Sequence, residues 1–173
     1  MTKTSKNVFY MFVGLPGSGK STYFKAMRDT YVNTARPFVY CSTDDVIEDR
    51  AKEKGKTYSE VFEDEIKMAT KLVEANRDLA IKMEMDIIHD QTNLNPKKRK
   101  AWLDKIPSDW ARICIVFQVP EHAEEEWKNR LTSRKGKHIP QHVIDQMEAS
   151  YVEPTEDEGF DNVFFINSFE ETA

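Results

Sequence analysis

The sequence predicts an α/β fold: a parallel sheet of about five strands with helices on both faces and a helical lid. Short apolar segments alternate along the chain with longer amphipathic ones, the pattern of repeated strand–helix units. Neither an internal repeat nor a low-complexity linker interrupts this alternation, so residues 1–173 are expected to form a single domain. Ligands of such sheets bind beyond the carboxyl ends of the strands, so polar residues that follow a strand are the candidates for a site.

The predicted strands are short runs rich in β-branched and aromatic residues. They are Val8–Val13, Phe38–Cys41, Met85–His89, Ile113–Phe117 and Val163–Ile166. The fourth run is the most apolar and is expected to be a central strand of the sheet, whereas the last one closes the sheet.

Amphipathic segments predict the helices that connect these strands. They are Thr22–Tyr31, Asp45–Lys54, Ser59–Glu84, Pro96–Ile106, Pro120–Leu131 and Gln141–Tyr151. Ser59 and Asn95 are suitable N-caps, and Pro96 occupies the first helical position, where its missing N–H costs nothing.

The net charge of −5 argues against a strongly basic protein that binds nucleic acid over its whole surface. Basic residues nevertheless gather in Lys97–Lys100 and again within Lys128–Lys137, a segment without any acid. A local anion-binding surface is therefore compatible with the acidic total.

Several features point to a cytoplasmic protein that does not associate with membranes. The first seven residues are polar, and no apolar stretch is long enough to cross a bilayer. Cys41 and Cys114 fall in predicted strands, which favours small core residues in a reducing compartment over a disulfide.

Residues 14–21 match the phosphate-binding loop pattern G-x-x-x-x-G-K-[ST], between a predicted strand and a predicted helix. The stretch runs Gly14-Leu15-Pro16-Gly17-Ser18-Gly19-Lys20-Ser21 and is followed by Thr22. Such a loop turns its N–H groups toward phosphate oxygens, and the helix N-terminus adds partial positive charge. Lys20 would bridge the β- and γ-phosphates and the Ser21 hydroxyl would ligate Mg²⁺, so a P-loop NTPase-type fold that binds ATP and Mg²⁺ is expected.

Asp44 and Asp45 follow the second strand. A phosphoryl-transfer enzyme needs a carboxylate that takes the proton of the attacking hydroxyl, and Asp44 is the candidate for this base. The competing interpretation is helix capping, because aspartate is common in a first helical turn. Asp45 is interpreted in that way, as the residue that starts the helix.

The third strand leads into a polar segment. Asp90 ends it, and an acid after apolar residues fits a Mg²⁺ ligand of the Walker B kind. His89 is interpreted as a structural residue of the strand. Thr92 and Asn93 are candidates for contacts with the substrate, whereas Asn95 is explained as a helix cap.

Arg130 and Arg134 are spaced i and i+4 and are expected on one face of a helix that Gly136 ends. Two neighbouring guanidinium groups repel each other unless they meet an anion, so a phosphate clamp is one interpretation. A solvated basic face beside Glu124–Glu126 is the other.

These motifs, in this order and spacing, resemble the kinase domain of the bacteriophage polynucleotide 5′-kinases over nearly the whole chain. They are Gly14–Thr22, Asp44-Asp45, Gln91-Thr92-Asn93-Leu94-Asn95-Pro96, the basic run with Trp102, and Arg130-x-x-x-Arg134 before Ile139-Pro140. The second polar segment is the most specific part, because many functions share a phosphate-binding loop. The resemblance implies transfer of the γ-phosphate of ATP to a 5′-hydroxyl end of DNA or RNA.

The resemblance also implies roles for individual residues. Asp44 falls on the general base, Lys20 and Ser21 on the loop pair, and Arg130 and Arg134 on arginines that grip the donor phosphates.

Two positions depart from the family pattern. An arginine that contacts the acceptor's phosphate is replaced by Ile47, with Arg50 one turn later as a possible substitute, and the family's aspartate before Thr92 is replaced by Gln91. Nothing in the chain resembles the phosphatase domain that the family's enzyme can carry.

Two other functions compete with a polynucleotide kinase. The first keeps the chemistry but phosphorylates a hydroxymethylated base in DNA, a nucleoside or another small alcohol, and Ile47 and the acidic net charge favour it. The second is a nucleotide-binding regulatory module without an acceptor, which needs neither Asp44 nor paired arginines. In a polynucleotide kinase Lys97–Lys100 would track the phosphates of the nucleic-acid strand, and the alternative interpretation of this run is a solvated helix face.

Overall fold

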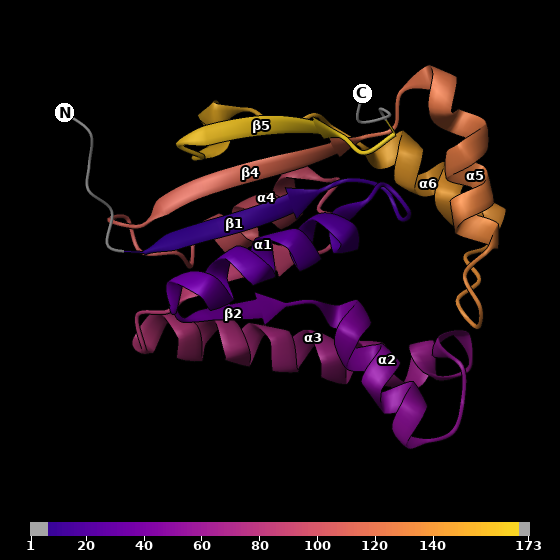
Figure 1. Ribbon diagram of the computed structural model, residues 1–173, viewed down its shortest axis with the longest axis horizontal. Helices are drawn as coiled ribbons and strands as arrows, with labels where there is room; N and C mark the ends of the chain where they lie inside the picture. Colours follow the sequence, from indigo (N-terminus) through magenta and orange to yellow (C-terminus); the bar gives the residue numbers. More distant parts are fainter. Residues whose placement is uncertain (1–6, 170–173) are drawn as a thin grey trace.

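The computed structural model describes residues 7–169 and contains the predicted parallel sheet (Figure 1). Its strands are β1 (Val8–Val13), β2 (Phe38–Cys41), β3 (Asp86–Asp90), β4 (Ala111–Gln118) and β5 (Asn162–Asn167). Its helices are α1 (Lys20–Thr34), α2 (Thr43–Glu53), α3 (Tyr58–Lys82), α4 (Pro96–Leu103), α5 (Glu124–Thr132) and α6 (Gln141–Ser150), with short 3₁₀ turns η1 (Glu121–Ala123) and η2 (Glu156–Glu158). The strand order is β2-β3-β1-β4-β5, and every pairing is parallel.

Strand β1 occupies the middle of the sheet, between β3 and β4. Strand β4 lies between β1 and β5, so the prediction that the fourth strand is a central one is confirmed. Phe12 of β1 lies opposite both Asp90 of β3 and Ile115 of β4. This register brings the phosphate-binding loop and the polar end of β3 to the same edge of the sheet.

Helices cover both faces, as predicted. On one face, Val73 and Ala80 of α3 and Trp102 of α4 pack against β1 and β3. On the other, Tyr31 of α1 packs beside Phe12 and Ile88. Burying these aliphatic and aromatic side chains between the layers supplies most of the favourable free energy of folding.

A smaller apolar cluster lies beyond the carboxyl ends of the strands, where Figure 1 shows α5 and α6. Trp127 of α5, Ile144 of α6 and Phe169 form its centre. We call residues 121–150, which include these two helices, the lid. Among residues 7–169 no helix is long and apolar enough to cross a membrane.

The predicted starts of helices α2 and α3 were wrong. Helix α2 is capped by Ser42, whose hydroxyl accepts from the Asp45 amide at 3.2 Å, so Asp45 lies inside the first turn. Helix α3 is capped by Thr57, which forms a capping box with Glu60. In both cases an earlier hydroxyl accepts an N–H that the first turn leaves unpaired.

Candidate active site

The phosphate-binding loop joins β1 to α1 through Gly19, which is the N-cap of α1 and makes no side-chain cap hydrogen bond. Its φ of 101° is left-handed, and an added Cβ would collide with the Ser168 side chain. The first-turn amides of α1 therefore keep their N–H groups for another acceptor. A phosphate group provides such an acceptor, and the helix dipole favours its negative charge.

Lys20 lies at the mouth of this loop. Its Nζ donates to the carbonyl oxygens of Gly14 at 2.9 Å and Leu15 at 2.8 Å. Burial lowers the pKa of Lys20, while the carboxylates of Asp90 and Asp44 oppose that effect. The ammonium is thus held by two neutral carbonyls, which phosphate oxygens can replace with charge-assisted hydrogen bonds.

Two hydrogen bonds from distant segments hold the backbone of the phosphate-binding loop in place. Trp127 of the lid donates from its Nε1 to the Pro16 carbonyl at 2.7 Å, and Ser168 donates to the Ser18 carbonyl at 2.7 Å. Through Trp127, the lid packs directly against the phosphate-binding loop.

The Asp44 carboxylate is held at both oxygens. Tyr58 donates its hydroxyl to Oδ1 and the Lys137 ammonium donates to Oδ2, each at 2.6 Å. Burial raises the pKa of Asp44, but the charge and hydrogen bond of Lys137 outweigh it, so the pKa is lower than usual. Half of the Asp44 side chain, 51%, remains exposed. An ionised, fixed and accessible carboxylate has the properties of a general base.

Neither Tyr58 nor Lys137 was identified from the sequence. Tyr58 begins a helix after a turn, and Lys137 was grouped with the basic run Lys128–Lys137 without a role. The only available signal was a lone lysine directly after Gly136.

Asp45 has different surroundings from its neighbour. Its carboxylate accepts from the Ser42 hydroxyl at 3.3 Å. Burial raises the pKa of Asp45, and the negative charges of Glu48 and Asp90 raise it further. Asp45 therefore takes part in the hydrogen bonds that cap the N-terminus of α2.

Asp90 ends β3 beside the loop, and it is 8% exposed. Tyr40 donates to its Oδ2 at 2.5 Å. Burial raises the pKa of Asp90, and the positive charge of Lys20 opposes that rise. Ser21 is exposed in the first turn of α1.

These two residues are compatible with Mg²⁺. Within residues 7–169 no group of three or more His, Cys, Asp or Glu side chains forms a metal site. Mg²⁺ in triphosphate sites, however, takes only one or two protein oxygens and completes its shell with water and phosphate. The Ser21 hydroxyl and the Asp90 carboxylate are hard oxygen donors of this type.

The polar residues after Asp90 mainly make hydrogen bonds within the protein. Asn93 is 3% exposed, has a left-handed φ of 48°, and donates to the Phe12 carbonyl at 2.8 Å. This amide supports the end of β1 and is turned away from solvent. Thr92 accepts the Gly14 N–H through its carbonyl at 3.0 Å and lines a pocket of about 210 Å³ with Asn95 and Lys98.

The two lid arginines do not share a helix face, because α5 ends at Thr132. Arg130 bonds Glu126 at 2.6 Å and stacks over the Phe169 ring at 3.9 Å. Arg134 lies beyond the end of α5, at the start of a turn that the Lys137 N–H closes on the Arg134 carbonyl, and it is half-buried. Its positive charge lowers the pKa of both Asp44 and Lys20, so Arg134 lies near the candidate base and the loop lysine.

Other basic candidates are engaged in ion pairs within the protein. Arg50 bonds Glu53 at 2.9 Å and Glu65 at 3.4 Å, and Ile47 is fully buried. Arg99, in the middle of the basic run, is also fully buried and donates to both Glu158 oxygens, at 2.7 and 2.6 Å. Only the lysines of that run are exposed.

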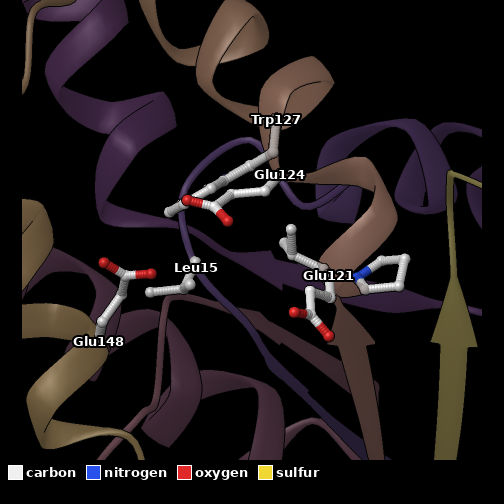
Figure 2. A pocket seen from close by; sticks show the side chains of 7 residues that line it. Leu15, Glu121, Glu124, Trp127 and Glu148 are labelled. Atoms are coloured by element: carbon white, nitrogen blue, oxygen red, sulfur yellow. The ribbon is translucent and has the colours of Figure 1, made fainter.

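A second pocket, of about 150 Å³, lies where Leu15, the end of β4 and the lid meet (Figure 2). Three carboxylates, those of Glu121, Glu124 and Glu148, surround it beside Trp127. Like charges repel, so this pocket is unsuitable for phosphate, and the α1 amides and Lys20 are the candidate anion-binding groups.

Comparison with known proteins agrees with this geometry. The family model AAA_33, described as an AAA domain, matches residues 9–154. The chain belongs to this family. It is also 26% identical over 163 residues to the bifunctional polynucleotide phosphatase/kinase of Schizosaccharomyces pombe, covering 93% of this chain and 34% of that protein. The chain thus spans about a third of the length of that relative.

Solved structures share the fold. A protein of Chloroflexus aurantiacus superposes with a TM-score of 0.67 at 12% identity, covering 94% of this chain and 86% of that one. A gluconokinase of Sinorhizobium meliloti gives 0.55 at 16% identity, with coverages of 97% and 86%. The chain therefore has a P-loop kinase-type fold and homology to a polynucleotide kinase.

Proposed function

We propose that this protein is an ATP-dependent polynucleotide kinase, which transfers the γ-phosphate of ATP to a 5′-hydroxyl end of DNA or RNA. The observation that carries this proposal is the Asp44 carboxylate, which is ionised, accessible and electrostatically coupled to Lys20 of the phosphate-binding loop. A nucleotide-binding switch has no use for such a base, whereas a kinase with an alcohol acceptor requires one.

In the proposed reaction Asp44 accepts the proton of the acceptor hydroxyl as its oxygen bonds to the γ-phosphorus. The bond from that phosphorus to the bridging oxygen breaks, and ADP leaves. Lys20 and Arg134 stabilise the charge of the transferred group, while Arg130 grips the donor from the lid. Mg²⁺, held by Ser21 and Asp90, would neutralise charge on the phosphates.

Two observations support a nucleic acid as the acceptor. The first is the relationship to the fission-yeast enzyme, whose name includes a polynucleotide kinase. The second is the exposed pair Lys97 and Lys98 at the start of α4, with Lys98 lining the pocket that contains Thr92. In this proposal these groups would meet phosphates of a strand whose 5′ end reaches Asp44. Thr92 would contact that strand, whereas Asn93 and Arg50 serve contacts within the protein.

A small-alcohol acceptor is the second candidate, and the charge around the base favours it. Asp44, Asp45 and Glu48 lie on neighbouring turns of α2, and the nearest arginine of that helix is paired with Glu53 and Glu65. A neutral nucleoside or a hydroxymethylated base would meet less repulsion there than a phosphodiester.

The test compares Asp44→Asn with Asp45→Asn, using [γ-³²P]ATP with a 5′-hydroxyl oligonucleotide and with a panel of nucleosides. Asp44→Asn should lower kcat by roughly 10²–10⁴ with little change in KM for ATP. Asp45→Asn should mainly lower stability, by about 1 kcal/mol. Absence of label in every acceptor with the wild-type protein would refute a kinase, and label in nucleosides alone would establish the second candidate.

A further inference from the structure

Lys137 is buried although it belongs to an exposed segment. Lys135, Gly136 and His138 around it are exposed, whereas the side chain of Lys137 is 7% exposed. An ammonium group leaves water only where opposite charges compensate it. Asp44 at 2.6 Å and Glu48 at 3.2 Å provide those charges, and the Tyr58 ring lies 4.1 Å from Nζ.

The backbone around Lys137 is fixed on the start of α3. The Gly136 carbonyl accepts from the Ser59 N–H at 3.1 Å, and the His138 N–H donates to the Ser59 hydroxyl at 2.9 Å. Gly136 has a φ of +71°, and a Cβ there would lie 3.0 Å from the Thr57 side chain. Glycine is thus required for this approach. Figure 1 shows the segment reaching from α5 and α6 toward α2 and α3.

The same segment carries Arg134. The Lys137 N–H donates to the Arg134 carbonyl at 3.3 Å. A single turn therefore separates Arg134, whose charge acts on Lys20, from Lys137, which holds Asp44. If Lys137 left Asp44, Arg134 would move with it.

We propose that Lys137 is a positioning residue that fixes the Asp44 carboxylate and couples closure of the lid to assembly of the catalytic base. The proposal rests on the function proposed above for Asp44. With Tyr58 on one oxygen and Lys137 on the other, the carboxylate has a single orientation only while the lid segment is docked on α3. Lid closure and formation of the base are then one event, so ATP is gripped only when the acceptor hydroxyl can be deprotonated.

Several groups influence the ionisation of Asp44, and the test must separate the effect of Lys137 from the effects of the others. These groups are the charged side chains of Lys137 and Arg134 of the lid, Glu48 and Asp45 of α2, Lys20 of α1 and Asp90 of β3, together with the neutral hydroxyl of Tyr58 of α3. Lys137 makes the largest favourable contribution to the ionised form. Its removal should therefore raise the pKa of Asp44 and move the acid limb of kcat/KM to higher pH, because the base must be ionised.

The experiment uses the full chain and the variants Lys137→Met, Lys137→Arg and Tyr58→Phe, with Lys135→Met as the matched exposed control. Steady-state transfer from ATP to a 5′-hydroxyl oligonucleotide is measured from pH 5 to 9. Amide exchange of His138 is followed without any ligand. Lys137→Met should lower kcat by about 10- to 100-fold with little change in KM for ATP, shift the acid limb upward, and speed exchange at His138. Lys137→Arg should recover most of the rate, and Lys135→Met should match the wild type.

Tyr58→Phe keeps Lys137 and removes only the tyrosine hydroxyl that donates to Oδ1 of Asp44. It should move the acid limb of kcat/KM to higher pH while leaving amide exchange at His138 unchanged. This variant therefore tests the ionisation of Asp44 even if Lys137→Met folds poorly. Wild-type kcat, acid limb and exchange in Lys137→Met would overturn the proposal. A lower kcat with an unmoved acid limb would also overturn it, since Lys137 would then act on packing alone.

A failure of the proposed function is distinguishable from a failure of this inference. If the wild-type protein phosphorylates no acceptor, Asp44 can still be titrated by carboxyl ¹³C NMR in the wild type and in Lys137→Met. An Asp44 pKa that rises in the variant, together with faster His138 exchange, supports the coupling of lid and carboxylate. An unchanged pKa refutes it.

Discussion

Strand β3 has a buried aspartate at each end, Asp86 and Asp90, and the two differ in how their charge is compensated. Asp86 accepts from the Val8 N–H at 2.8 Å and the Tyr31 hydroxyl at 2.8 Å, and Arg36 donates to it at 3.0 Å. Asp90 accepts from the Tyr40 hydroxyl and is near Lys20, which itself bonds two carbonyls. With the Asn7 amide at 3.4 Å, four protein donors including an arginine enclose the Asp86 carboxylate, whereas Asp90 has fewer donors among the described residues.

The difference shows what each end of the sheet contributes. At the amino end, the buried Asp86 carboxylate is fully paired within the chain, which stabilises the fold. At the carboxyl end, Lys20, Asp90 and the first-turn amides of α1 are only partly satisfied by the protein. Incomplete pairing of this kind costs stability and is found where a ligand completes the site.

The largest expected effect comes from Lys20→Met, which removes a cation from the partly satisfied end. Phosphoryl transfer should fall by at least about 10²- to 10³-fold, because charge on the phosphates loses a preorganised donor. The thermal melt should change little, since Lys20 bonds only carbonyls of its own loop. Lys25→Met, on the exposed side of α1, is the control and should behave as the wild type. Turnover above about a tenth of wild type, with equal melts, would contradict the assignment of this loop.

The next effect separates the two aspartates directly. Asp86→Ala should lower the free energy of unfolding by about 3 kcal/mol, because Arg36, Tyr31 and the Val8 amide lose a shared acceptor. Its kcat, per folded molecule, should stay within about twofold of wild type, since the reacting groups lie at the other end of the sheet. Asp90→Asn should do the reverse and lower kcat with little change in stability.

Urea unfolding and initial-rate assays on the same preparations measure both quantities. Asp104→Ala, whose exposed carboxylate pairs with Lys100, serves as a control and should change the free energy of unfolding by about 1 kcal/mol or less. A loss of activity in Asp86→Ala that equals the loss in Asp90→Asn would remove the distinction between the two ends.

Local sequence signals predicted most of the fold and the phosphate-binding loop. The alternation of apolar and amphipathic segments depends on short-range periodicity, and all five strands lie where it indicated. His89, interpreted as structural, is fully buried and stacks on Trp102 at 3.6 Å, and burial lowers its pKa to about 3.

Contacts between distant segments could not be predicted in the same way. Lys137 meets Asp44 across 93 positions, and Arg99 meets Glu158 across 59. Both residues look like members of basic runs, because sequence shows that a charge is present but not which carboxylate it will meet. Arg134 was expected on a helix for a similar reason, as i, i+4 spacing says nothing about where the helix ends.

The smallest expected effect concerns the exposed lysines of α4, which distinguish the two candidate acceptors. Arg99 is excluded from this test because it is fully buried against Glu158, so its loss would disturb the fold. Replacing Lys97 and Lys98 with glutamine should raise KM for a 5′-hydroxyl oligonucleotide a few-fold and flatten its dependence on salt. Each lost phosphate contact reduces the number of counterions released on binding. KM for ATP should stay unchanged.

A nucleoside acceptor has no phosphodiester to reach these lysines, so its KM should be the same in the wild type and the double variant. Lys105→Gln, exposed beyond the end of α4, is a matched control for the loss of positive charge. The measurement is KM for oligonucleotide and for nucleoside between 50 and 200 mM salt, the range over which phosphate contacts weaken most visibly. Equal salt slopes for both proteins with the oligonucleotide would mean that α4 does not hold a strand. The acid-rich surface around Asp44, Asp45 and Glu48 would then favour a small neutral alcohol as the acceptor, because such a substrate avoids the repulsion that a phosphodiester meets there.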